Sequence, residues 1–185
     1  MKAFLIIIAV VAVIVLILIS LYNGLVRADN LVKEAFSTMD VYMKKRYDLI
    51  PNLVNTVKGY ATHEKETLDA VISARNSAAS ANTPTAKLEA EGELNQVMSR
   101  LFALTESYPD LKANTNFLDL QNQLSVVETE IAQSRKYYNA TARDFNNKVK
   151  TFPTVLVAGA FGFTVAPMFE ITDAVQRETV NVSFD

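Results

Sequence analysis

The chain opens with an unbroken run of apolar positions. Residues 3–19 are all apolar, and Leu21 extends the run beyond the single hydroxyl group of Ser20. As an α-helix rising about 1.5 Å per residue, this run spans the roughly 30 Å hydrocarbon layer of a bilayer. A cleaved secretory signal would have a shorter apolar core and a small-x-small cleavage site, which the residues around Ser20 do not offer. The pattern therefore predicts a transmembrane anchor over residues 1–22, with Tyr22 in the headgroup zone.

After the anchor, apolar residues recur at steps of three and four, the spacing that lines one face of a helix. Each stripe needs a partner that buries it, and short connections favour antiparallel neighbours. The predicted fold is all-α: the transmembrane helix, then an antiparallel bundle over residues 23–150 of about four long helical segments with coiled-coil-like seams. The four seams are Val32, Phe36, Met39, Met43, Arg46, Ile50, Leu53, Val57 and Tyr60; Leu68, Val71 or Ile72, and Arg75; Leu88, Leu94, Met98, Leu101, Thr105 and Tyr108; and Phe117, Leu120, Leu124, Val127, Ile131, Ser134, Tyr138, Ala142, Phe145, Val149 and Phe152.

Prolines and small polar residues interrupt these seams. Pro51 lies inside the first seam, which keeps its phase, so we expect a kink or a new helix start at residues 49–52. Residues 76–82 suit a helix end and a turn, and Thr83 followed by Pro84 suits a new helix start. Pro109 interrupts the third segment. If neither Pro51 nor Pro109 reverses the chain, the seams would instead form one long two-armed hairpin with its tip near Asn82.

Residues 151–185 have a different character. Residues 154–166 are mostly apolar and contain Gly159 and Gly162, which makes them too short and too glycine-rich for a second span. We expect this tail to pack on the bundle, on the membrane interface or on a neighbouring protomer. Residues 180–184 alternate like a strand, which could pair with residues 168–171 or with another protomer.

Composition excludes several classes of chemistry. The chain has no Cys and one His, so it cannot form disulfides, thiolate zinc sites or a multi-His metal centre by itself. His63 is followed by Glu64 but by no second His at metal-ligand spacing, so a surface histidine is the better interpretation. A net charge of -2 argues against nucleic acid, and Lys44, Lys45 and Arg46 favour a solvated helix face. We expect no cofactor and no metal.

Several charged residues lie on or beside the apolar seams. A half-buried Arg needs a carboxylate, because its charge cannot be removed by deprotonation. One hypothesis is that at least one Arg–carboxylate pair between helices fixes the register of the bundle; the alternative is that all of these residues are solvated flanks. The candidates are Asp40, Arg46, Asp48, Arg75, Glu106, Glu130 and Arg135.

Longer blocks of sequence resemble the LemA family of bacterial membrane proteins, in order and over nearly the whole chain. The resemblance implies an N-terminal anchor and an α-helical, bundle-like domain, with a biochemical role that is not established for the family. The blocks that carry it are YNGLVR at 22–27, FSTMDV at 36–41, KRYDLIPNLV at 45–54, VKGY at 57–60, HE at 63–64, ARN at 74–76, ESYPDLKAN at 106–114, TEIA at 129–132 with Arg135, YYN at 137–139 and FP at 152–153.

Three functions remain open at this stage. The leading hypothesis is a non-enzymatic, membrane-anchored helical scaffold that binds itself, as a homo-oligomer, or another membrane-associated protein. The alternatives are a sensor or adaptor that relays a signal through the kink at Pro51, and a hydrolase of unrecognised type. Lys2 precedes the apolar run of the anchor while Arg27 and Lys33 follow it, which favours a single-pass protein of the bacterial inner membrane with its bundle on the cytoplasmic side.

Overall fold

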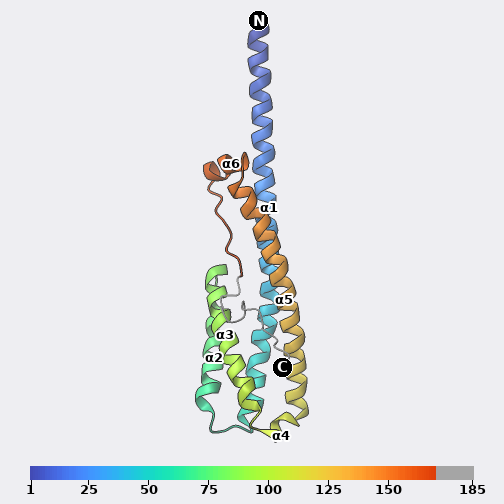
Figure 1. Cartoon of the computed structure of the whole chain (residues 1–185), viewed down its shortest axis with the longest axis vertical. Helices are drawn as coiled ribbons and strands as arrows, with labels where there is room; N and C mark the ends of the chain where they lie inside the picture. Colours follow the sequence, from blue (N-terminus) through green and yellow to red (C-terminus); the bar gives the residue numbers. More distant parts are fainter. Residues whose placement is uncertain (170–185) are drawn as a thin grey trace, which may run out of the picture.

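A computed structural model of the chain describes residues 1–169, and these are almost entirely helical (Figure 1). The elements are α1 (Lys2–Lys58), α2 (Lys65–Ser80), α3 (Pro84–Thr105), the short α4 (Pro109–Lys112), α5 (Thr115–Lys150) and α6 (Thr154–Phe161). The all-α prediction is confirmed. The described residues contain no strand, and the strand predicted at residues 180–184 lies outside them.

Helix α1 is one continuous helix of 57 residues that belongs to two environments. Its first part is long and apolar enough to cross a membrane, and the described structure buries none of it. From Leu25 onward it carries a buried stripe that packs chiefly on α5 and also on α2. In Figure 1 the bare part projects beyond the bundle as a single rod.

The bundle reverses direction between α1 and α2, between α2 and α3, and between α3 and α5. The two-armed hairpin is therefore wrong. Pro109 opens the short turn α4 between α3 and α5, so it takes part in a chain reversal rather than in a kink. Thr83 accepts a hydrogen bond from the Ala86 amide (3.2 Å), which gives α3 the N-cap expected from its sequence. Asn114 caps α5 in the same way, by accepting from the Phe117 amide (3.0 Å).

The structure decides two local expectations. Helix α1 passes through Pro51 without a new start, so the new-start alternative at residues 49–52 is wrong. Helix α2 ends at Ser80, within the run of residues 76–82 where a helix end and a turn are expected. The buried face of α2 consists of Leu68, Val71, Ala74 and Ala78. Two alanines therefore continue the buried stripe of α2 beyond Val71, its last large apolar residue.

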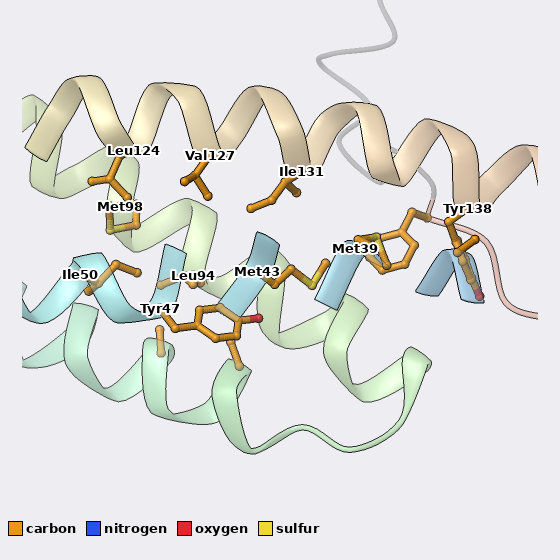
Figure 2. Packing of buried hydrophobic residues seen from close by; sticks show 14 of the residues in the cluster. Met39, Met43, Tyr47, Ile50, Leu94, Met98, Leu124, Val127, Ile131 and Tyr138 are labelled. Atoms are coloured by element: carbon orange, nitrogen blue, oxygen red, sulfur yellow. The ribbon is translucent and has the colours of Figure 1, made fainter. Parts of the chain in front are cut away.

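The core lies along the seams of α1, α3 and α5, as Figure 2 shows. Met39, Met43 and Ile50 of α1 face the interior with less than 2% of their side chains exposed. On α5, Thr141 and Ala142 are both buried where the seam makes two successive steps of four, which is how a stutter moves the buried face around a helix. The described tail returns along α5, and Phe169 packs edge-on against Tyr138 (5.4 Å between ring centroids).

Candidate functional site: a buried ion-pair network

Arg46 of α1 lies in the centre of the bundle, with 2% of its side chain exposed. Its seam position turns it inward together with Met43 and Ile50. One terminal nitrogen donates to Glu91 Oε2 of α3 (3.0 Å) and the other to Asn95 Oδ1 (2.7 Å). Arg46 Nε lies 2.9 Å from Glu128 Oε1 of α5, close enough for an ion pair but not aligned as a hydrogen bond. One guanidinium group therefore joins three helices.

Glu91 is as deeply buried as Arg46, and protein donors occupy both of its oxygens. Oε2 accepts from Arg46, and Oε1 accepts from the Tyr47 hydroxyl group at 2.6 Å. Burial raises the pKa of Tyr47 well above its ordinary value of 10, and the adjacent Glu91 carboxylate raises it further. Tyr47 consequently stays a hydrogen-bond donor over the physiological range. Both Glu91 oxygens are thus occupied by donors from α1, and the side chain is only 2% exposed.

Further charges extend the network along the bundle. Buried Lys87 of α3 donates to Asp40 of α1 and lies over the Tyr47 ring, 5.9 Å from its centroid. Arg135 of α5 reaches to within 3.9 Å of Glu91 Oε2. Three cationic and three anionic side chains thus balance one another, as burial of charge requires. We call this set the ion-pair network: Asp40, Arg46, Tyr47, Lys87, Glu91, Asn95, Glu128 and Arg135.

Arg75 and Pro51 form a second, separate link between helices. In a regular helix the amide of residue 51 would donate to the Tyr47 carbonyl, but proline has no amide hydrogen. Arg75 Nε of α2 supplies the missing donor, at 3.0 Å from the Tyr47 carbonyl oxygen. The same guanidinium group lies 3.8 Å from the exposed carboxylate of Asp48. Pro51 is therefore accommodated inside α1, and the carbonyl that it frees ties α1 to α2.

The other candidates lie apart from these clusters. Glu106 is exposed and pairs with Lys112 across the α3–α4 turn (2.6 Å). Glu130 is half-buried and has no ion pair within residues 1–169. His63 is exposed, and the described part of the chain contains no group of three His, Asp or Glu residues suited to a metal. Lys44 and Lys45 are exposed as expected, but the expectation of a solvated face is wrong for Arg46, which lies on the seam and is buried.

Sequence reasoning missed the α3 half of the network. The buried stripe of α3 is Lys87, Glu91, Leu94, Met98, Leu101 and Thr105. Extending the alternating steps of three and four backward from Leu94 reaches Glu91 and then Lys87, so the spacing itself was the signal. The sequence pattern assigned Leu88 to the seam in place of Lys87, because Leu88 is apolar and directly follows Lys87. It is only half-buried beside the core.

Two asparagines of α5 hold the returning tail by its backbone. The Asn146 side chain donates to the Ala166 carbonyl (2.9 Å) and accepts from the Ala166 amide (2.7 Å). Asn139 pairs identically with Phe169, at 2.8 Å for both bonds. Seven helical residues rise about 10.5 Å and three extended residues about 10 Å, so the two spacings coincide. We call this pair the asparagine clamp.

An open groove runs along the outer side of the α1–α5 pair. It encloses about 510 Å³, and Lys45, Asp48 and Leu49 of α1 line it opposite Asn122, Gln123, Val126 and Val127 of α5. Val126 is 62% exposed, and Val41, two helical turns before Asp48, is 54% exposed. The lining of the groove combines apolar side chains (Leu49, Val126 and Val127) with polar ones (Lys45, Asp48, Asn122 and Gln123), as is common at protein contact surfaces.

Comparison with known proteins places this fold in a family. The sequence model of the LemA family matches residues 35–184, which include nearly the whole bundle and the tail. The chain belongs to the LemA family. A protein named LemA from Metamycoplasma hominis is 28% identical over 162 residues, which cover 87% of this chain and 74% of that protein. The family has no established biochemical role, and the resemblance found in the sequence is confirmed.

More distant relatives match only part of the chain. Magnetosome protein MamQ 2 of Paramagnetospirillum magneticum is 31% identical over 85 residues, 46% of this chain and 31% of that protein. Magnetosome protein MamQ of Magnetospirillum gryphiswaldense is 30% identical over 78 residues, 42% of this chain and 29% of that protein. Neither name specifies an enzymatic activity. Membrane association of this LemA-family chain is indicated by the first part of α1, which is long and apolar enough to cross a membrane and is not buried by the bundle.

Proposed function

We propose that this LemA-family protein is a non-enzymatic, membrane-anchored helical scaffold whose bundle binds a second protein molecule. One observation carries the proposal: α1 is bare and apolar over its first part, is buried in the bundle over the rest, and is continuous between the two. A helix without a break transmits the position of the anchor to the bundle. The bundle is then held at a fixed height and orientation above the lipid.

The interior of the bundle supports a positional role. The ion-pair network connects α1, α3 and α5 through Arg46 and Glu91, so the outer surface of the α1–α5 pair is presented in one arrangement. The groove beside Val126 lies on that surface. Confinement to a membrane raises the local concentration of potential partners, so that weak contacts at such a groove suffice for assembly. The partner is another copy of the chain or a different membrane-associated protein.

We further propose that the protein is a single-pass protein of the bacterial inner membrane with a cytoplasmic bundle. Phe36 faces Tyr138 across α1 and α5, and Arg46 faces Glu128. The same antiparallel register brings Lys148 beside residue 26 and Lys150 beside residue 24. With Arg27, this makes a basic collar where α1 leaves the lipid, whereas only Lys2 and the amino terminus lie on the other side. Anionic lipids of the cytoplasmic leaflet attract such a collar.

In-cell photo-crosslinking tests the scaffold proposal. A photoreactive residue replaces Val126 or Lys45, which both line the groove, in two differently tagged copies of the full chain, and Ser73, exposed on α2, is the control position. We expect adducts from the groove positions and none from Ser73. Adducts that carry both tags indicate self-association, and adducts with one tag indicate another protein. A folded, membrane-bound chain without any groove adduct would contradict the proposal.

A further inference from the structure

Helix α6 and its flanks form an apolar surface that the bundle leaves largely uncovered. Residues 151–169 contain no Asp, Glu, Lys or Arg. Within α6, Val157 and Ala158 are buried against the bundle, whereas Leu156 is 65% exposed and Phe161 is 64% exposed. Phe152, just before the helix, is 80% exposed. A helix that is apolar all round belongs in a protein core or in lipid, and the protein covers only one side of this one.

The position of α6 identifies what covers the other side. Leu156, Val157 and Phe161 line a hollow of about 340 Å³ together with Leu18, Ile19 and Tyr22 of α1. These α1 residues form the last turns of the apolar run. The exposed face of α6 is therefore at the same depth as the end of the anchor. In Figure 1, α6 lies beside α1 where the bare rod enters the bundle.

Aromatic and basic side chains surround this level as they do at a membrane interface. Tyr22 packs on Phe161 and Phe163, with ring centroids 4.8 Å and 5.9 Å apart. Aromatic rings favour the boundary between headgroups and acyl chains. Lys148 and Lys150 are exposed at the end of α5, immediately before the uncharged segment, where they can meet lipid phosphates.

Local structure holds α6 across the end of the bundle. The helix ends at Gly162, whose φ of 73° lies in the left-handed region that favours glycine. The Phe163 amide donates back to the Ala158 carbonyl (3.0 Å), which closes the helix end. The chain then turns along α5 into the asparagine clamp. With eight residues, about 12 Å, α6 cannot cross the hydrocarbon layer, but it can lie in one leaflet.

We propose that α6 is a second membrane contact, immersed at the lipid interface beside the anchor, with acyl chains filling the hollow between α6 and residues 18–22. This inference rests on the proposed anchoring of α1. The protein would then be attached to the membrane at two points, α1 and α6. The bundle is then prevented from tilting away from the bilayer on the α6 side, and α6 occupies space in only one leaflet.

Site-specific fluorescence tests this inference in the full chain, which has no native Cys. Single variants Leu156→Cys, Gly159→Cys and Ile19→Cys carry an environment-sensitive dye, and Leu118→Cys, exposed at the membrane-distal end of α5, is the control. A Cβ at Gly159 meets nothing within 4 Å, so this variant tests the helix without altering its packing. The protein is placed in vesicles of zwitterionic and anionic phospholipids, and quenching by aqueous iodide is compared with quenching by acyl-chain spin labels.

We expect the dyes at 156, 159 and 19 to be quenched several-fold more by spin-labelled lipid than the dye at 118, and several-fold less by iodide. Strong iodide quenching at 156 and 159 with lipid quenching at 19 would overturn the inference and leave the anchor intact. Iodide quenching at 19 as well would overturn both. Protection at 156 from both quenchers, with disulfides forming between Leu156→Cys copies, would show that a second copy covers α6 and would also overturn the inference.

Discussion

At the scale of single residues, Arg46 carries a permanent charge in the interior of the bundle. A buried ion pair adds little net stability compared with well-packed apolar residues, but loss of one partner is costly because the remaining charge is left uncompensated. Sliding α3 by one residue would separate Arg46 from Glu91 and turn a leucine-lined stripe outward. We therefore propose that the network selects the register of α1, α3 and α5.

Neutralising Glu91 should show how much more the buried Arg46–Glu91 pair contributes to stability than the exposed contact of Arg46 with Glu128. We expect Glu91→Gln to lower the free energy of unfolding by about 3 kcal/mol, because Arg46 loses its buried counter-charge. Glu128→Gln is the matched control, since Glu128 contacts the same guanidinium group but is 45% exposed. It should cost less than about 1 kcal/mol. Urea unfolding in detergent micelles, followed by helical circular dichroism, measures both, and equal costs would refute the register hypothesis.

Pro51 and Arg75 should be energetically coupled, because the arginine satisfies the carbonyl that the proline frees. We expect Arg75→Met to cost about 1–2 kcal/mol in the natural chain, where the Tyr47 carbonyl then lacks a donor. In a Pro51→Ala background the alanine amide satisfies that carbonyl, so the same substitution should cost about 1 kcal/mol less.

A double-mutant cycle on thermal unfolding measures this coupling. Strict additivity of the two substitutions would mean that Arg75 acts on α1 through Asp48 or through packing, and not through the freed carbonyl.

The seams predicted Arg46 as an inward-facing charge, because an arginine occupied a position that spacing assigned to the core. Its partner was not predicted, since Leu88 offered an apolar alternative to Lys87 and thereby displaced Glu91 from the seam. Spacing along one helix also cannot show which side chains of different helices meet. For that reason Asp48, Glu106 and Glu130 were as plausible from the sequence as Arg46, although the structure places them outside the network.

At the scale of elements, the asparagine clamp makes an extended segment part of a helical bundle. Asn139 and Asn146 satisfy the backbone of Phe169 and Ala166, and Tyr138 donates to the Pro167 carbonyl (2.8 Å). These hydrogen bonds go to backbone groups of the tail and do not depend on its side chains. They therefore leave no periodic pattern in the tail sequence. For that reason the path of the tail along α5 was not predicted, although its apolar character was.

Removal of one clamp residue should free the corresponding backbone group. We expect Asn139→Ala to speed hydrogen exchange at the Phe169 amide by about tenfold or more. The amide loses its acceptor, and the Phe169 backbone loses both of its hydrogen bonds to Asn139. Asn147→Ala is the control, since Asn147 is exposed on the same helix. Unchanged exchange at Phe169 in Asn139→Ala would show that apolar packing alone holds the tail.

The helix boundaries followed from short-range chemistry. Thr83 with Pro84 marked the start of α3, and Pro109 marked the interruption that follows it, because caps and prolines act within one turn. Pro51 did not end α1, since the remedy for its missing amide comes from Arg75 on another helix, which local sequence cannot show.

At the scale of the whole molecule, α1 unites the anchor and the bundle in one helix. Its apolar surface is continuous around the helix up to Leu21 and narrows to a single stripe from Leu25 onward. In the proposed anchoring, this change in pattern within one turn marks where lipid gives way to protein as the surrounding medium. Membrane attachment, bundle height and bundle orientation are then properties of one element.

A spin-label scan along α1 tests this account most directly. Single Cys substitutions at successive positions from residue 5 to residue 45 of the full chain, in phospholipid vesicles, report accessibility to oxygen and to a water-soluble nickel complex. We predict uniformly high oxygen and low nickel accessibility up to about residue 21, then a helical oscillation of period about 3.6 residues without interruption. Nickel accessibility throughout residues 5–21, or loss of the oscillation between residues 20 and 30, would contradict a lipid-embedded anchor that continues rigidly into the bundle.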